Sequence, residues 1–126
     1  MSTLRVGDIT LNIGDFVIIS TGNMLDYGWY CGQGRNTLQY YSVWSPGSAL
    51  EDYEKFQAGD KTGWRAERFM KQGFTSKCFY KSYINSYYES RVLKVADSDN
   101  LFTNPKTLEK YKKSKEALIK IKFLQQ

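Results

Sequence analysis

The sequence predicts a single α+β domain: a small antiparallel β-sheet or open barrel with a helical insertion and a long amphipathic helix near the C-terminal end. Three observations support this fold class. The first 45 residues form short apolar or alternating runs separated by turn residues, as β-strands do. The last twenty or so repeat apolar residues at helical spacing. A chain of 126 residues is long enough for one domain with its own core and too short for two ordinary domains.

The β-rich part is expected over residues 1–45. Residues 9–13 alternate between apolar and polar side chains, and 16–19 form a β-branched apolar run typical of a buried strand. Two aromatic-rich segments, 27–34 and 37–44, follow, with glycine, arginine and asparagine between them. Because such residues favour tight turns, we expect a hairpin there and three successive antiparallel strands in this part.

The middle of the chain is expected to be a helical insertion over residues 46–73. Ser48 and Glu51 have the spacing of a capping box, which predicts a short helix at about 49–57. Residues 64–72 predict a second short helical stretch. An aromatic and basic segment with a strand then covers 74–96, in which 91–96 is the predicted strand.

A long C-terminal helix is predicted over about 104–124. Asn104 is a favoured N-cap residue, and proline at the next position suits the first turn of a helix. Apolar residues then lie mostly along one stripe, and lysines fill much of the remaining surface. The lysines can bind an anionic partner or simply solvate an exposed helix face.

Residues 14–19, a turn and two aromatic-rich strands resemble the opening of small SH3-like β-barrels of the KOW or Tudor type. The resemblance covers about residues 7–45, with 91–96 as a further strand. A helical insertion inside the barrel and an appended helix depart from the family pattern. The resemblance implies a fold only, since such barrels bind nucleic acid, methylated peptides or other protein segments.

Composition argues against most enzyme classes. The sequence contains no histidine, which removes every catalytic arrangement and metal site that depends on an imidazole. We therefore expect a non-enzymatic protein with no catalytic residues, no metal and no cofactor, although a carboxylate-based enzyme stays an alternative. Two cysteines are too few for a disulfide framework, and no secretory signal or membrane-spanning run is evident, so we expect a cytoplasmic protein.

Charge is distributed unevenly along the chain. Residues 1–60 carry three Lys or Arg against seven Asp or Glu, whereas 61–126 carry fifteen against six. A basic half suggests an acidic partner: nucleic acid or an acidic protein surface. Within it, cationic and aromatic residues alternate, as a groove for single-stranded nucleic acid requires. The predicted nucleic-acid-binding residues are Lys71, Lys77, Tyr80, Lys81, Tyr83 and Arg91.

Aromatic residues make up 16% of the sequence, and several occur close together in the predicted strands. Since neighbouring residues of a strand point to opposite faces, they cannot all enter one core. Exposed rings can stack on bases or anchor a protein interface, and the alternative is that they form the core and its rim. The predicted interaction surface consists of Tyr27, Trp29, Tyr40, Tyr41 and Trp44.

The function these features favour is nucleic-acid binding of low sequence specificity, through basic and aromatic surface residues. The alternative is a small protein-interaction module, such as an adaptor or an inhibitor of a larger protein complex. We expect the terminal helix to pack on the sheet rather than bind a membrane. The sequence leaves the oligomeric state open.

Overall fold

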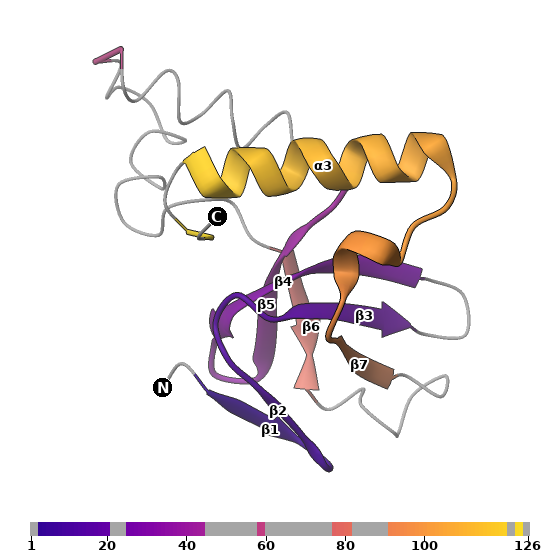
Figure 1. The fold of residues 1–126 in the computed structure, drawn as a ribbon. Coiled ribbons are helices and arrows are strands. Elements are labelled where there is room, and N and C mark those ends of the chain that lie inside the picture. Colours follow the sequence, from indigo (N-terminus) through magenta and orange to yellow (C-terminus); the bar gives the residue numbers. More distant parts are fainter. Residues whose placement is uncertain are drawn as a thin grey trace.

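A five-stranded antiparallel sheet forms the centre of the computed structural model (Figure 1), which describes residues 3–20, 25–44, 58–59, 77–81, 91–120 and 123–124. Its strands have the order β6-β5-β4-β3-β7. They are β3 (Phe16–Ser20), β4 (Leu25–Gln33), β5 (Thr37–Ser42), β6 (Lys77–Tyr80) and β7 (Arg91–Val95). The predicted meander in the first 45 residues and the predicted strand at 91–96 are therefore confirmed.

The sheet is open between its two edge strands. Three strands separate β6 from β7 in the sheet order, and the described residues include no pairing between these two. The structure thus supports the α+β class and the antiparallel sheet, and not a closed barrel. The predicted helices at 49–57 and 64–72 lie outside the described residues.

A separate two-stranded hairpin precedes the sheet. It consists of β1 (Leu4–Val6) and β2 (Ile9–Leu11), joined by a two-residue turn. Gly7, the first turn residue, has φ +59°, a conformation that glycine adopts without steric cost and that such tight hairpin turns require. The alternation at residues 9–13 predicts β2, whereas β1 is a strand that the sequence did not predict.

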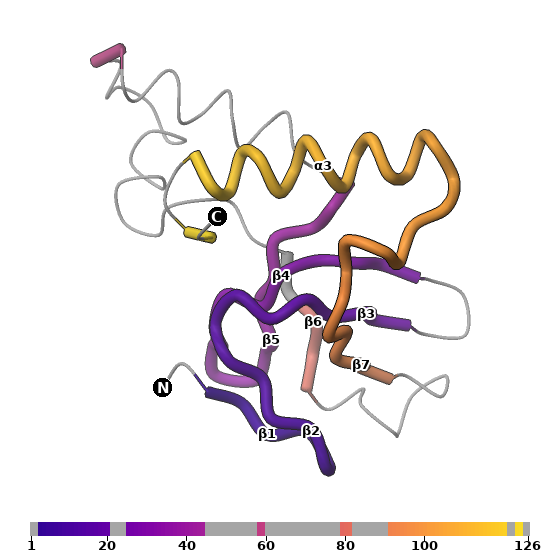
Figure 2. Tube along the Cα trace, viewed as in Figure 1, coloured from indigo at the N-terminus to yellow at the C-terminus, as the bar shows by residue number. Residues whose placement is uncertain are grey.

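Two apolar clusters lie on opposite faces of the sheet, because successive residues of a strand alternate between the faces. On one face, Val17 and Ile19 pack with Leu11 of the hairpin and with residues of every other strand of the sheet. On the other face, Phe16 packs against Tyr111 of the C-terminal helix. Figures 1 and 2 show the resulting order of layers: hairpin, sheet, helix.

The C-terminal helix α3 (Pro105–Lys120) begins where the sequence predicts. The side chain of Asn104 accepts hydrogen bonds from the backbone N–H groups of Lys106 at 2.9 Å and Thr107 at 3.4 Å, so it caps the helix. The predicted end at 124 is wrong. Instead, the N–H groups of Phe123 and Leu124 both donate to the carbonyl of Leu118, which departs from the i to i−4 pattern of a continuing helix.

A single 3-10 turn, η2 (Ser98–Asn100), connects β7 to the segment that leads into α3. The sequence predicts a turn here, since Asp97 to Asn100 are turn-favouring residues. The side-chain amide of Asn100 donates to the Asp97 carboxylate at 2.7 Å, which holds the turn closed. Its position next to α3 brings two acidic side chains close to the helix.

Candidate nucleic-acid interface

The five residues of the predicted aromatic surface differ in how far they are buried. Trp29 and Tyr40 are 2% exposed, so these two rings belong to the core and offer no contact surface. Tyr27 and Tyr41 are half-buried, with their rings edge-on against Phe102 and Phe123 at centroid distances of 4.9 and 4.8 Å. Trp44 alone among these five side chains is exposed, at 40%.

A buried carboxylate explains why Tyr40 points inward. Asp26 accepts hydrogen bonds from the Tyr40 hydroxyl at 2.7 Å and from the Ser42 hydroxyl at 3.0 Å. Gly28 makes this arrangement possible, because a Cβ there would lie 2.7 Å from the Tyr40 ring and 2.4 Å from the Tyr41 carbonyl oxygen. Buried polar groups need hydrogen-bond partners. Here the register of the strands supplies the partners, and the sequence does not show that register.

The basic and aromatic tract is only partly described. Tyr80 is exposed on β6, and Lys81 just beyond it is half-buried, with its ammonium 2.5 Å from the Gln33 side-chain oxygen. Lys77 belongs to β6, while Arg91 is exposed on β7 at the opposite edge of the sheet. Lys71 and Tyr83 lie outside the described residues. The sheet therefore groups Lys77, Tyr80 and Lys81 at one edge and places Arg91 at the other.

The most basic element of the described chain is α3. Its 16 residues include six lysines and two glutamates. Lys106, Lys110 and Lys113 are all exposed, and their i, i+4, i+7 spacing places them on one flank of the helix. Lys113 forms an ion pair with Glu109 at 3.0 Å, but both side chains are 65% exposed, so water screens the pair and it is weak.

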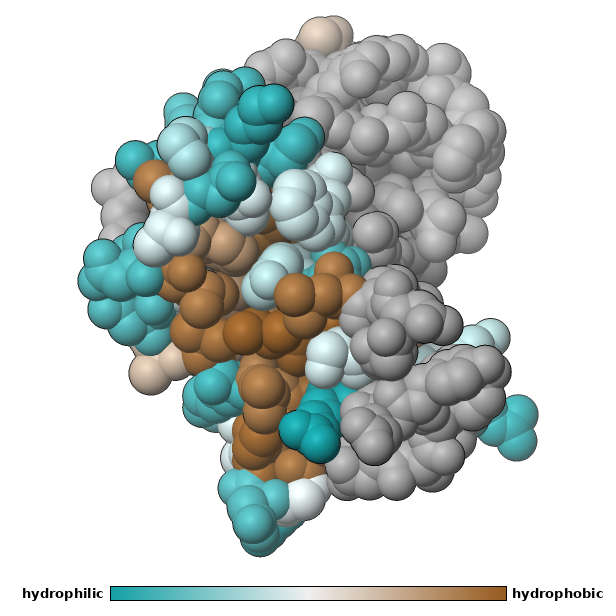
Figure 3. All heavy atoms as spheres, turned by 90° about the vertical axis from the view of Figure 1, so that its right-hand side faces the viewer, coloured by the Kyte–Doolittle hydropathy of each residue, from teal (hydrophilic) through white to brown (hydrophobic). Residues whose placement is uncertain are grey.

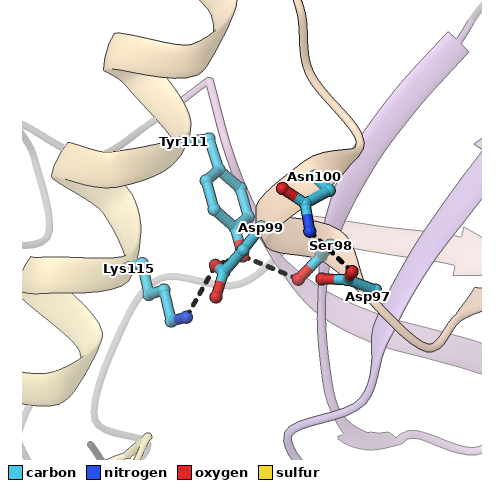
Figure 4. A network of polar contacts seen from close by, with 6 residues as sticks. All are labelled: Asp97, Ser98, Asp99, Asn100, Tyr111 and Lys115. Carbon is cyan, nitrogen blue, oxygen red and sulfur yellow. Dashed lines mark hydrogen bonds and ion pairs between the residues drawn. The ribbon is translucent and has the colours of Figure 1, made fainter.

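The opposite flank of α3 is less positive because acidic groups face it. The Lys115 ammonium lies 2.8 Å from the Asp99 carboxylate, and the Tyr111 hydroxyl donates to the same carboxylate at 2.7 Å (Figure 4). These two contacts lower the pKa of Asp99. A hollow of about 280 Å³ opens on this flank, and its lining residues are Asp99, Leu108, Tyr111, Lys112, Lys115, Glu116 and Ile119.

Tyr111 connects the turn η2 to the helix and to the apolar cluster. Its ring stacks on Trp29 with centroids 5.5 Å apart, and its hydroxyl lies 2.6 Å from the Ser98 hydroxyl. Because the Tyr111 proton goes to Asp99, Ser98 is the donor in this second contact. Burial is the main reason that the pKa of Tyr111 rises to about 12. This network connects the turn η2, the helix and the sheet.

The chain just before Trp44 contacts the middle of α3. The Ser114 hydroxyl donates to the carbonyl of Val43 at 2.7 Å, which ties the chain just before Trp44 to the helix. Figure 2 shows this chain rising from β5 to the middle of α3. Lys110 precedes Ser114 by one helical turn, so the two residues are neighbours on the helix surface. The backbone that carries the exposed Trp44 side chain therefore reaches α3 one helical turn from Lys110, a relation that sequence separation hides.

Comparison with known proteins identifies no relative: no family model matches the chain, and no curated protein or solved structure matches it significantly. Within the described ranges, no three acidic or thiol side chains are grouped so that they could hold a metal ion. No helix in these ranges is long and apolar enough to cross a membrane.

Proposed function

We propose that this protein binds nucleic acid through the exposed flank of α3 that carries Lys106, Lys110 and Lys113. The observation that carries the proposal is this concentration of exposed positive charge on one side of a well-packed helix. Lysine ammonium groups neutralise phosphates and release counterions, which is the main source of sequence-independent affinity. Because Tyr111, Ala117 and Leu118 anchor the helix to the sheet, the flank is presented in a fixed orientation.

The same helix argues for low sequence specificity. The planar side chains of Arg, Asn and Gln recognise base edges through paired hydrogen bonds, and α3 contains none of these residues. Its exposed polar side chains are nearly all lysine and glutamate. The lysine ammonium groups contact phosphates, and such contacts position a nucleic acid without distinguishing bases. We accordingly propose a non-enzymatic binding protein that needs no cofactor.

Residues at the sheet edges form a second, separate part of the proposal. Lys77, Tyr80 and Lys81 at the β6 edge and Arg91 at the β7 edge are proposed as separate contact points, and Lys71 and Tyr83, which lie outside the described residues, are proposed as further contacts. The return of β7 to the side of β3 also supports the proposed relation to SH3-like folds, since it adds a late strand to an early meander.

The test is a fluorescence-anisotropy titration with a labelled oligonucleotide at several salt concentrations. The triple variant Lys106→Gln, Lys110→Gln, Lys113→Gln should lose most of the affinity. Its slope of log K against log salt should fall by about 2, since each single-strand phosphate contact contributes about 0.7. The double variant Arg5→Gln, Arg35→Gln, which removes exposed charges elsewhere, is the control. Binding that is absent at low salt, or insensitive to salt, contradicts the proposal.

One observation favours the alternative function, a protein-interaction module. Leu25 and Leu93 are 53% and 47% exposed on the strands that flank β3, on the face where Ile18 also lies. Figure 3 shows apolar residues gathered in a band on the side of the molecule that includes the ends of these strands. Exposed apolar patches of this kind often mark protein contacts.

A capture experiment from nuclease-treated lysate separates the two functions. If the alternative holds, a protein should be retained by the wild type and by the control variant Ile13→Ser, which removes an exposed apolar side chain elsewhere. The same protein should be lost with the double variant Leu25→Ser, Leu93→Ser. Equal retention by all three proteins contradicts a docking role for this patch.

A further inference from the structure

We infer that the basic flank of α3 takes single-stranded nucleic acid, and that Trp44 is the residue on which a base stacks. This inference rests on the proposed function and adds the strand state of the partner. The structural basis is an exposed indole ring on a residue whose neighbour, Val43, is bonded to Ser114, one helical turn from Lys110 in the row of exposed lysines.

Trp44 is held in place by its neighbours rather than by its own burial. The residue before it, Val43, is fully buried and is bonded to Ser114 of α3. The backbone N–H of Trp44 itself donates to the Ser42 hydroxyl at 3.1 Å, and Ser42 in turn is bonded to buried Asp26. Since the backbone is fixed on this side, little freedom is lost when the ring contacts a ligand.

The lysines are spaced to follow one strand past the ring. Lys106 and Lys113 are separated by seven residues, which corresponds to about 10 Å along the helix axis. A flexible single strand can pass its phosphates along this row of ammonium groups. A strand whose phosphates contact these lysines can place a base on the Trp44 side of the helix, near Lys110.

A duplex can use the lysines of this arrangement but not the indole ring. Its bases are stacked on each other and paired, so no base face is available to an indole ring at the protein surface. In a single strand every base has a free face, and stacking on an aromatic ring is tolerant of sequence. The exposed ring therefore adds affinity for single strands only, while the lysines contribute to binding of either form.

The experiment compares a labelled single-stranded oligonucleotide with a duplex of the same length by anisotropy, at one low salt concentration. We expect at least tenfold tighter binding of the single strand. Trp44→Ala should weaken single-strand binding by about 5- to 150-fold, the range observed for loss of one stacking contact, and leave duplex binding unchanged. Trp44→Phe should retain most of the single-strand affinity, because a phenyl ring also stacks.

Charge variants on the two flanks of α3 are the matched controls. Lys110→Gln, on the Trp44 side, should reduce single-strand affinity several-fold, whereas Lys112→Gln, beside Asp99 and Glu116, should have a smaller effect. If Trp44→Ala fails to fold, tryptophan fluorescence provides a second measurement. The oligonucleotide should quench the wild type more strongly than Trp44→Phe.

The possible failures are distinguishable. The inference is overturned if the duplex binds as tightly as the single strand or more tightly, or if Trp44→Ala leaves single-strand affinity unchanged. In either case, binding that still depends on salt supports the proposed function. Absence of binding to both oligonucleotides at low salt overturns the inference and the proposed function together.

Discussion

Tyr30 and Tyr40 are directly opposite each other on β4 and β5, and both are buried, but their hydroxyl groups differ. The Tyr40 hydroxyl donates to Asp26, whereas the Tyr30 hydroxyl has no hydrogen-bond partner in the described part of the chain. Burial raises the pKa of Tyr30, with a smaller contribution from Cys31. One hydroxyl thus contributes to stability, and the other is desolvated without compensation.

The pair supplies a matched stability test. Tyr40→Phe should lower the free energy of unfolding by about 1.5–3 kcal/mol, because it removes a hydrogen bond to a buried carboxylate. Tyr30→Phe should be neutral or stabilising by up to about 1 kcal/mol, since it removes a buried polar group that lacks a partner. Urea denaturation of both variants measures the difference. Equal destabilisation by the two variants would mean that the Tyr30 hydroxyl is hydrogen-bonded in solution.

At the scale of elements, the contact between η2 and α3 determines how the helix is oriented on the sheet. Ser98 and Asp99 of η2 both bond to Tyr111, and Lys115 adds an ion pair to Asp99. The same tyrosine packs against Phe16 and Trp29 of the sheet. The short turn η2, which the sequence shows only as a polar segment, therefore connects the helix layer to the sheet.

This contact should make stability depend on pH at the alkaline end. Burial and the hydrogen bond to Asp99 favour the neutral phenol of Tyr111, so its folded-state pKa of about 12 lies above the unfolded value. A raised pKa means that its stabilising contribution is complete below about pH 10 and is lost as the pH rises towards 12. Tyr111→Phe should cost about 1–2 kcal/mol at pH 7 and flatten this alkaline loss. Urea denaturation between pH 7 and 12 measures both effects.

At acidic pH the same network should make stability depend on pH in the opposite direction, so that stability is lost as the pH falls. The pKa of Asp99 is lowered, first by Lys115 and then by Tyr111, so its contribution is present at neutral pH and lost as the pH falls below about 4. Tyr111→Phe should retain most of this acidic dependence because the ion pair with Lys115 remains. If Tyr111→Phe loses stability at alkaline pH as the wild type does, the alkaline loss does not come from Tyr111.

At the scale of the whole molecule, the sheet is stabilised from both faces. The hairpin covers one face through Leu11, and α3 covers the other through Leu118; both side chains are buried. Because β3 contributes residues to both clusters, the two layers share a strand and should unfold together.

Leu11→Ala and Leu118→Ala test this coupling. Each should destabilise the protein by about 2–5 kcal/mol, the usual effect of truncating a buried leucine. In both variants, circular dichroism and tryptophan fluorescence should report one common denaturation midpoint. Separate midpoints for the helix signal and the fluorescence signal would show that the layers unfold independently.

Local sequence patterns were sufficient to predict the elements that depend on a few adjacent residues. The strands β3, β4, β5 and β7 follow from short apolar runs between turn residues, and the start of α3 follows from Asn104 and the proline after it. Charge counts alone also show that the basic residues are concentrated in the second half of the chain. These properties depend on neighbours along the chain, so the sequence by itself determines them.

Tertiary structure decided which of the predicted surface residues are at the surface. Trp29, Tyr40 and Trp44 are all aromatic residues of the predicted strands, so the sequence does not distinguish them. Strand pairing and register place Trp29 against Tyr111 and Tyr40 against Asp26, and they leave Trp44 exposed. It also decided that one flank of the helix faces Asp99 while the other faces solvent. Burial and charge pairing depend on residues tens of positions apart, and no local pattern encodes those contacts.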